Sequence, residues 1–96
     1  MRVILHPLIH SDLFEAMEFY EREGGPQLAA DLFYEFEKAI DTISIRPLSF
    51  SVFTRAYRRA PLYRFPFHIL FSIEASYLFV LALRHNRRHP DFGLER

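Results

Sequence analysis

Two runs of aromatic and branched residues in the second half of the chain, separated by only three residues, constrain the fold more than any other feature. They extend from Arg64 to Ile73 and from Tyr77 to Leu83, with Glu74-Ala75-Ser76 between them. Each run is too short for a typical buried helix and is rich in the residue types that favour strands. The sequence therefore predicts a β-hairpin at the centre of a sheet.

The first run also predicts which side chains meet the core. Successive side chains on a strand point to opposite faces of the sheet. The odd-numbered positions from Phe65 to Ile73 are all apolar, whereas the even-numbered positions between them include His68 and Ser72. We expect the apolar face to meet the core and the second face, with His68 on it, to be partly polar.

An amphipathic helix is expected near the start of the chain. Ser11 or Asp12 precedes an apolar stripe of helical period and is expected to cap this helix, with Glu15 three residues after Asp12 in capping-box spacing. Gly24-Gly25 is expected to end the helix, because glycine commonly follows the last helical turn.

A second amphipathic helix and three shorter segments complete the predicted elements. The helix begins at Pro26 and cannot continue past Arg46-Pro47, because proline is tolerated in the first turn of a helix but not in its interior. A short strand is expected over residues 1–5, an irregular stretch over residues 48–54 and a further strand over residues 55–60. A proline follows that last strand and either ends it or places it at a sheet edge.

Together these elements predict an α+β fold of order βααβββ, in which a helical hairpin packs on a small, twisted and mostly antiparallel sheet. No linker or repeat divides the 96 residues, so we expect a single domain over residues 1–96. The chain has no cysteine, which excludes disulfides, thiolate nucleophiles and cysteine-ligated metals. It has no apolar run approaching about 18 residues, and we expect a soluble, cytoplasmic protein without a membrane partner.

The charges are segregated although the net charge is zero. Residues 1–45 hold nine acids and three bases, and residues 46–96 hold three acids and nine bases, which is about −6 against +6. Such asymmetry favours an anionic or acidic partner on the C-terminal half, or else the two halves neutralise each other across the fold. Arginine favours bidentate contacts to phosphate or carboxylate. The candidate basic residues are Arg55, Arg58, Arg59, Arg64, Arg84, Arg87 and Arg88.

The five histidines do not form a recognisable metal site. Two pairs have i, i+4 spacing, but Pro7 and Pro90 break the helices on which such pairs would converge. We expect no metal and no cofactor. His68, His85 and His89 are candidates for acid–base chemistry if the protein is a nuclease, because histidine titrates near neutral pH. The alternative for His68 is a hydrogen-bonded histidine within the sheet.

Four segments follow one another in a recognisable order. They are Asp12 to Glu21, Arg46-Pro47, Arg64-Phe65-Pro66-Phe67 and His85-Asn86-Arg87-Arg88-His89-Pro90. The ParE branch of one toxin superfamily typically has four such features in this order. They are an early acidic-aliphatic helix, an x-Pro turn, an Arg-Phe-Pro-aromatic strand start and a final His-x-Arg-Arg-x-Pro. Over nearly its whole length the chain therefore resembles the RelE/ParE toxins of bacterial toxin–antitoxin modules.

The resemblance implies the toxin of a type II pair, of the kind that stabilises plasmids. ParE-like members inhibit DNA gyrase without chemistry of their own and are neutralised by a cognate antitoxin. We expect oligomers only through the antitoxin or by weak self-association. The residues expected to leave the core and contact the target are Arg84, Arg87 and Arg88, with Arg58, Arg59 and Arg64 as supporting contacts.

RelE-like members provide the alternative, because they cleave messenger RNA on the ribosome with a cluster of lysine and arginine. This chain is neutral and has one lysine, Lys38, which argues against holding ribosomal RNA through counterion release. Arg58, Arg84, His85 and His89 nevertheless keep an endoribonuclease open. A third alternative is an inactive family member that retains only antitoxin binding.

Overall fold

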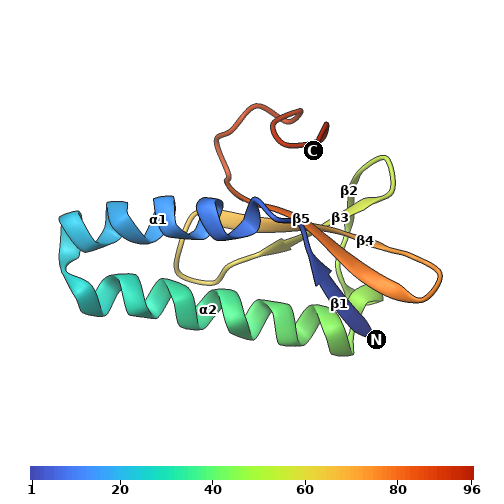
Figure 1. Ribbon diagram of the computed structural model, residues 1–96, viewed down its shortest axis with the longest axis horizontal. Coiled ribbons are helices and arrows are strands. Elements are labelled where there is room, and N and C mark those ends of the chain that lie inside the picture. The colour runs from blue at the N-terminus through green and yellow to red at the C-terminus, as the bar shows by residue number, and fades with distance from the viewer.

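A computed structural model describes the protein over residues 1–96 and places two helices beside a five-stranded sheet (Figure 1). The helices lack the length of apolar sequence that a membrane span requires. The elements are β1 (Arg2–Leu5), α1 (Ile9–Gly24), α2 (Pro26–Ile45), the 3-10 turn η1 (Pro47–Ser49), β2 (Val52–Thr54), β3 (Tyr57–Pro61), β4 (Phe67–Ile73) and β5 (Tyr77–His85).

The strands lie in the order β1-β5-β4-β3-β2, so the predicted hairpin of β4 and β5 forms the centre of the sheet. β1 runs parallel to β5, and every other neighbouring pair is antiparallel. The predicted α+β class is confirmed, but the structure has one more strand than the predicted order. β2 lies in the stretch that was predicted to be irregular. Three residues are too few to show a strand pattern, and a tight turn with Arg55 at φ 52° brings them against β3.

The two helices form the predicted antiparallel hairpin. Gly25 separates them at φ 90°, a conformation that strains any residue with a side chain, and Pro26 opens α2 as expected. The predicted start of α1 is wrong. The helix begins at Ile9 without a side-chain cap, and Asp12 lies within its first turn with its carboxylate directed elsewhere.

Both helices bury their apolar stripes against one face of the sheet. This core contains Ile9, Leu13, Ala16, Leu32, Phe36, Ile43, Ala60, Leu62, Phe65, Ile69, Phe71, Leu78, Val80 and Leu83. Phe65, Ile69 and Phe71 thus share the helix-covered face, as the alternation predicts. Burial of such side chains stabilises the fold by about 1.5–3 kcal/mol each, before the entropy cost of ordering them.

The second face of the sheet is also buried, which the sequence did not indicate. Residues 86–96, here called the C-terminal segment, turn back after β5, and Leu94 packs against Leu70, Leu81 and Ala82. In Figure 1 this segment lies above β5, whereas α2 lies below it. A bulge in the pairing of β4 with β5 leaves Leu81 without a partner, so Leu81 and Ala82 both face Leu94.

An ion pair closes the free edge of β5 beyond the end of β1. The Arg96 guanidinium donates two hydrogen bonds to the Asp12 carboxylate, at 2.6 and 2.7 Å, and a third to the Leu81 carbonyl oxygen. Asp12 also accepts the backbone N–H of Leu83 at 3.1 Å. The hydrogen bonds to Asp12 raise the pKa of the Arg96 guanidinium. These two side chains therefore take the place of a longer β1 and join α1 to the end of the C-terminal segment.

We expect Asp12→Asn to lower the free energy of unfolding by about 3 kcal/mol. Removing one member of a buried pair leaves the other charge without its counterion, and both side chains are nearly buried, at 10% and 11% exposure. Urea unfolding at pH 7 measures the change. Glu18→Gln, on the exposed side of the same helix, is the control. A loss below about 0.5 kcal/mol, as for ordinary surface substitutions, would show that the pair does not fasten the segment.

Candidate functional site

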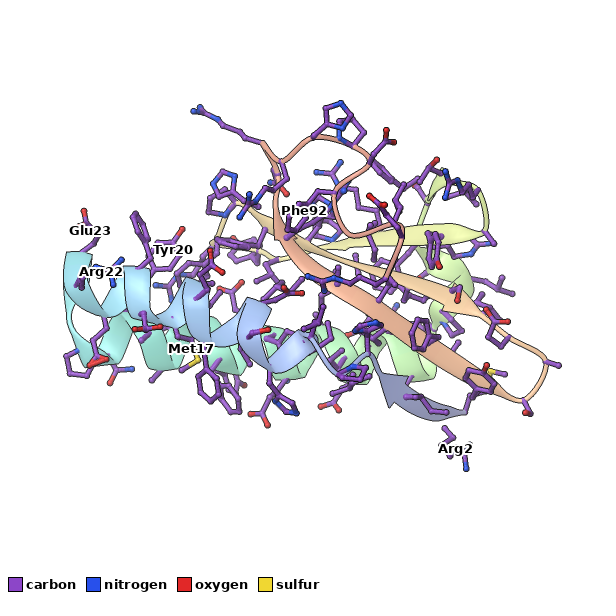
Figure 2. The ribbon with its side chains drawn as sticks, turned by 45° about the horizontal axis from the view of Figure 1, so that its top comes forward. Arg2, Met17, Tyr20, Arg22, Glu23 and Phe92 are labelled. Carbon is purple, nitrogen blue, oxygen red and sulfur yellow. The ribbon has the colours of Figure 1, made fainter.

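A groove of about 410 Å³ lies between α1, the adjacent ends of β4 and β5, and the C-terminal segment. Figure 2 shows Tyr20 on α1 and Phe92 on the C-terminal segment at its two sides. The Tyr20 ring packs edge-to-face on Phe65 and Phe67, and burial raises the pKa of its hydroxyl. The apolar lining is Ala16, Phe19, Tyr20, Phe67, Leu83 and Phe92, and the polar lining is Asp12, Glu15, Arg22, Arg84, His85 and Arg88.

Arg84 does not occupy the position that the sequence predicts. We expected its side chain to leave the core, but the residue is only 3% exposed and lies on the second face of the sheet. Its Nη1 donates to the carbonyl oxygens of His89, Pro90 and Phe92, at 3.2, 2.8 and 2.9 Å. Burial lowers the pKa of this guanidinium, and the nearby positive charge of Arg59 acts in the same direction. Arg84 thus binds the C-terminal segment.

His68 is the hydrogen-bonded sheet histidine that the sequence offered as one alternative. Its Nε2 accepts the Nε–H of Arg84 at 2.9 Å, which requires the ring proton to be on Nδ1 and to be donated to the side-chain oxygen of Asn86 at 2.7 Å. Burial lowers the pKa of His68 to about 4, opposed by the Asn86 hydrogen bond and assisted by the charges of Arg59, Arg84 and His85. Both ring nitrogens are therefore occupied in the neutral tautomer.

Arg87 and Arg88 lie beyond the end of β5, as predicted, and are exposed. Arg87 makes no ion pair with its side chain, and its backbone N–H donates to Nδ1 of His85. The guanidinium of Arg88 stacks over the Phe92 ring, 4.4 Å from the centroid, and its Nη2 lies 3.8 Å from a Glu15 carboxylate oxygen. This pair is half-exposed, so it contributes little stability and leaves Arg88 available to a stronger partner.

The other predicted arginines are not brought together with Arg87 and Arg88. Arg58 donates to the Phe50 carbonyl oxygen at 2.6 Å on the helix-covered side of the sheet. Arg59 lies near the Phe53 ring on the second face, and its buried Nε has no hydrogen-bond partner. Arg64 pairs with Asp31 and Glu35 of α2, and Arg55 lies in the turn between β2 and β3.

The three candidate acid–base histidines are also separated. His68 is buried on the second face, whereas His85 lines the groove with its ring edge-on to Phe67. His89 is exposed in the C-terminal segment, where its Nδ1 accepts the backbone N–H of Asp91. Both ring nitrogens of His68 are hydrogen-bonded within the protein, so it has no free nitrogen with which to pass a proton to or from a substrate.

Sequence reasoning missed two parts of this site. Nothing in the sequence pattern distinguishes Phe92 from an ordinary core or base-stacking aromatic residue, yet it forms one wall of the groove and supports Arg88. Asp12 was interpreted as a helix cap, but it binds Arg96 at the far end of the chain. The apolar residues Phe92 and Leu94 within a polar tail were the available signal that this tail returns to the fold.

Comparison with known proteins gives a match in structure but none in sequence. No family model matches the chain, and no curated protein matches it. Nine chains of solved structures match it. One of them belongs to a structure described as the chromosomal ParDE TA system from P. aeruginosa, with a TM-score of 0.79 and 16% identity, covering 88% of this chain and 95% of that chain. The similarity shows a shared fold and confirms the fold implied by the sequence resemblance.

The hydrogen bonds of His68 predict that acid destabilises the protein. The pKa of His68 is about 4 in the folded chain against an ordinary value of 6.5, so the unfolded chain binds this proton more readily. Its contribution to stability is complete above about pH 6.5 and is lost as the pH falls through about 4. The loss over this interval is at most about 3 kcal/mol.

Urea unfolding of wild type and His68→Gln at pH 7 and pH 4 measures this contribution. The wild type should lose more stability on acidification than the variant, and the exposed-histidine control His89→Gln should follow the wild type. Equal losses in all three proteins would contradict the assigned tautomer and its hydrogen bonds.

Proposed function

We propose that this protein is the toxin of a type II toxin–antitoxin pair. The observation that carries the proposal is the match in fold over 88% of the chain to a protein from a ParDE TA system. The four sequence segments that resemble the ParE branch, and that follow one another in the order typical of it, support the same proposal. The proposal is therefore supported by a similarity of local motifs and, independently, by a similarity of the whole backbone.

The proposed target is DNA gyrase, bound through Arg87 and Arg88. These two guanidinium groups are exposed on a segment that is held in place by buried contacts, and Arg87 has no ion pair within the chain. Their planar guanidinium groups can donate bidentate hydrogen bonds to a carboxylate or phosphate on the target. Arg58 and Arg64 are left out of the contact set because their guanidinium groups bind the protein itself.

The proposed antitoxin site is the groove between α1 and the C-terminal segment. Its floor is aromatic. Arg22, His85 and Arg88 also line the groove, whereas Glu15 contributes the single exposed carboxylate. An amphipathic acidic segment would bury apolar side chains on the floor and place carboxylates against the guanidinium groups of Arg22 and Arg88. A short acidic protein encoded beside this chain is the expected partner.

Gyrase inhibition is favoured over ribosome-dependent cleavage of messenger RNA. The chain is neutral with a single lysine, so it lacks the excess of positive charge that binds ribosomal RNA. His68 has both nitrogens occupied and a pKa of about 4, which leaves it unsuited to proton transfer near neutral pH. Arg84, which a nuclease would direct at a phosphate, binds three backbone carbonyls instead.

We expect replacement of Arg87 and Arg88 together by alanine to abolish growth inhibition and inhibition of gyrase supercoiling. Loss of charge-assisted contacts to a target costs about 2–5 kcal/mol of binding, whereas exposed substitutions change folding stability by about 0.5 kcal/mol or less. Supercoiling assays and urea unfolding measure the two quantities. The control is the Arg2→Ala, Arg46→Ala double variant, which removes the same charge from exposed positions elsewhere.

Three results would contradict this assignment in different ways. Codon-register cleavage of messenger RNA in a reconstituted translation reaction would replace gyrase by the ribosome. A wild type that inhibits neither process but binds the antitoxin would identify an inactive family member. Full toxicity of the Arg87, Arg88 double variant would place the target contacts elsewhere on the sheet.

The groove is tested separately with Phe19→Glu. Phe19 is 47% exposed and lines the groove, whereas Phe33 on α2 is 40% exposed and does not. We expect Phe19→Glu to weaken binding of the neighbouring acidic protein at least tenfold. The substitution removes an aromatic anchor and adds a negative charge that repels the acidic partner. The matched variant Phe33→Glu should bind within about threefold of wild type. Equal effects, measured by calorimetry, would move the antitoxin site to another surface.

A further inference from the structure

The loop that carries Arg87, Arg88 and Phe92 has few contacts of its own with the rest of the protein. Residues 86–92 are all exposed, and no regular element includes them. Their backbone hydrogen bonds are local turns, apart from the Asn86 N–H, which donates to the Pro66 carbonyl oxygen. A short exposed segment of this kind samples many conformations unless something buried fixes it.

Arg84 supplies that buried contact. Three carbonyl oxygens, from His89, Pro90 and Phe92, converge on a single nitrogen, Nη1. The same guanidinium donates its Nε–H to Nε2 of His68. Its central carbon lies over the Phe53 ring, 4.9 Å from the ring centroid. The loop is therefore folded around a side chain whose own position is set by β4 and β2.

We infer that Arg84 is the positioning residue of the target-binding loop: its guanidinium fixes the backbone on which Arg87, Arg88 and Phe92 are presented. The inference rests on the proposed function for the role of Arg87 and Arg88. Arg84 is 3% exposed and cannot itself meet a macromolecular target. It acts by removing the conformational freedom that the loop would otherwise lose on binding, which is the general benefit of preorganisation.

Two substitutions at Arg84 distinguish its hydrogen bonds to the loop carbonyls from its hydrogen bond to His68. Arg84→Gln removes Nη1 and leaves the three carbonyl groups without their donor. Arg84→Lys places an ammonium group with three N–H donors near the three oxygens and loses only the bond to His68. Arg46→Gln removes an equal charge from an exposed position and is the control.

The first measurement is amide hydrogen exchange, which does not depend on any target. The amides of Phe92 and Leu94, bonded to the His89 and Asp91 carbonyl oxygens, should exchange at least about tenfold faster in Arg84→Gln than in wild type. Arg84→Lys should stay within about threefold of wild type, and Arg46→Gln should not differ from it. Unchanged exchange in a folded Arg84→Gln protein would overturn the inference.

The second measurement separates positioning from general destabilisation. In a wild-type background, Arg87→Ala should weaken gyrase inhibition about thirtyfold, the equivalent of one charged contact. In the Arg84→Gln background the same substitution should cost less than about threefold, because Arg87 is no longer held where the target meets it. Equal losses in the two backgrounds would show that Arg84 does not position Arg87 and would overturn the inference.

If Arg84→Gln does not fold, Arg84→Lys carries the test. A folded Arg84→Lys protein with protected Phe92 and Leu94 amides and inhibition within about threefold of wild type supports positioning through the carbonyl groups. A folded Arg84→Lys protein whose loop amides exchange freely, yet which inhibits as well as wild type, overturns it. A wild type without activity on gyrase refutes the proposed function, and the exchange rates then still decide whether Arg84 orders the loop.

Discussion

The buried guanidinium of Arg84 is the interaction on which the C-terminal part of the structure depends. A charged group taken out of water is costly unless its donors are satisfied. Here no carboxylate pairs with it; backbone carbonyls and the neutral ring of His68 accept its hydrogen bonds instead. If the segment left the sheet, the guanidinium would lose its hydrogen bonds to the three backbone carbonyls and Leu94 would lose its apolar contacts. A tail of eleven mostly polar residues is thereby made part of the fold.

The same arrangement connects stability to the candidate function. α1 and α2 cover one face of the sheet, and the C-terminal segment covers part of the other through Leu94. Its end is fastened to α1 by Arg96 and Asp12, and its start is fixed by Arg84. Arg87 and Arg88 lie close to the Arg84 contact, so the exposed cations are carried by backbone with little freedom. Stability at Arg84 and binding at Arg87 are therefore expected to change together.

The sequence predicted the parts of the fold that follow from short-range patterns. The β4–β5 hairpin, the two helices, the glycine turn and the proline stop were all visible as periodicity or as turn chemistry. β2 was missed because three residues carry no period. The burial of Arg84 was missed because it depends on carbonyl groups that return from later in the chain. Asp12 was misread because a capping-box pattern and a long-range ion pair place the same residue type near a helix start.

The most direct test of this account is an NMR observation of the Arg84 side chain at pH 7. The account predicts slowly exchanging guanidinium protons with couplings across the hydrogen bonds to the Pro90 and Phe92 carbonyl groups. It also predicts nuclear Overhauser contacts from the Leu94 methyl groups to Leu70 and Ala82. Rapidly exchanging, conformationally averaged Arg84 signals with random-coil shifts over residues 86–96 would contradict it.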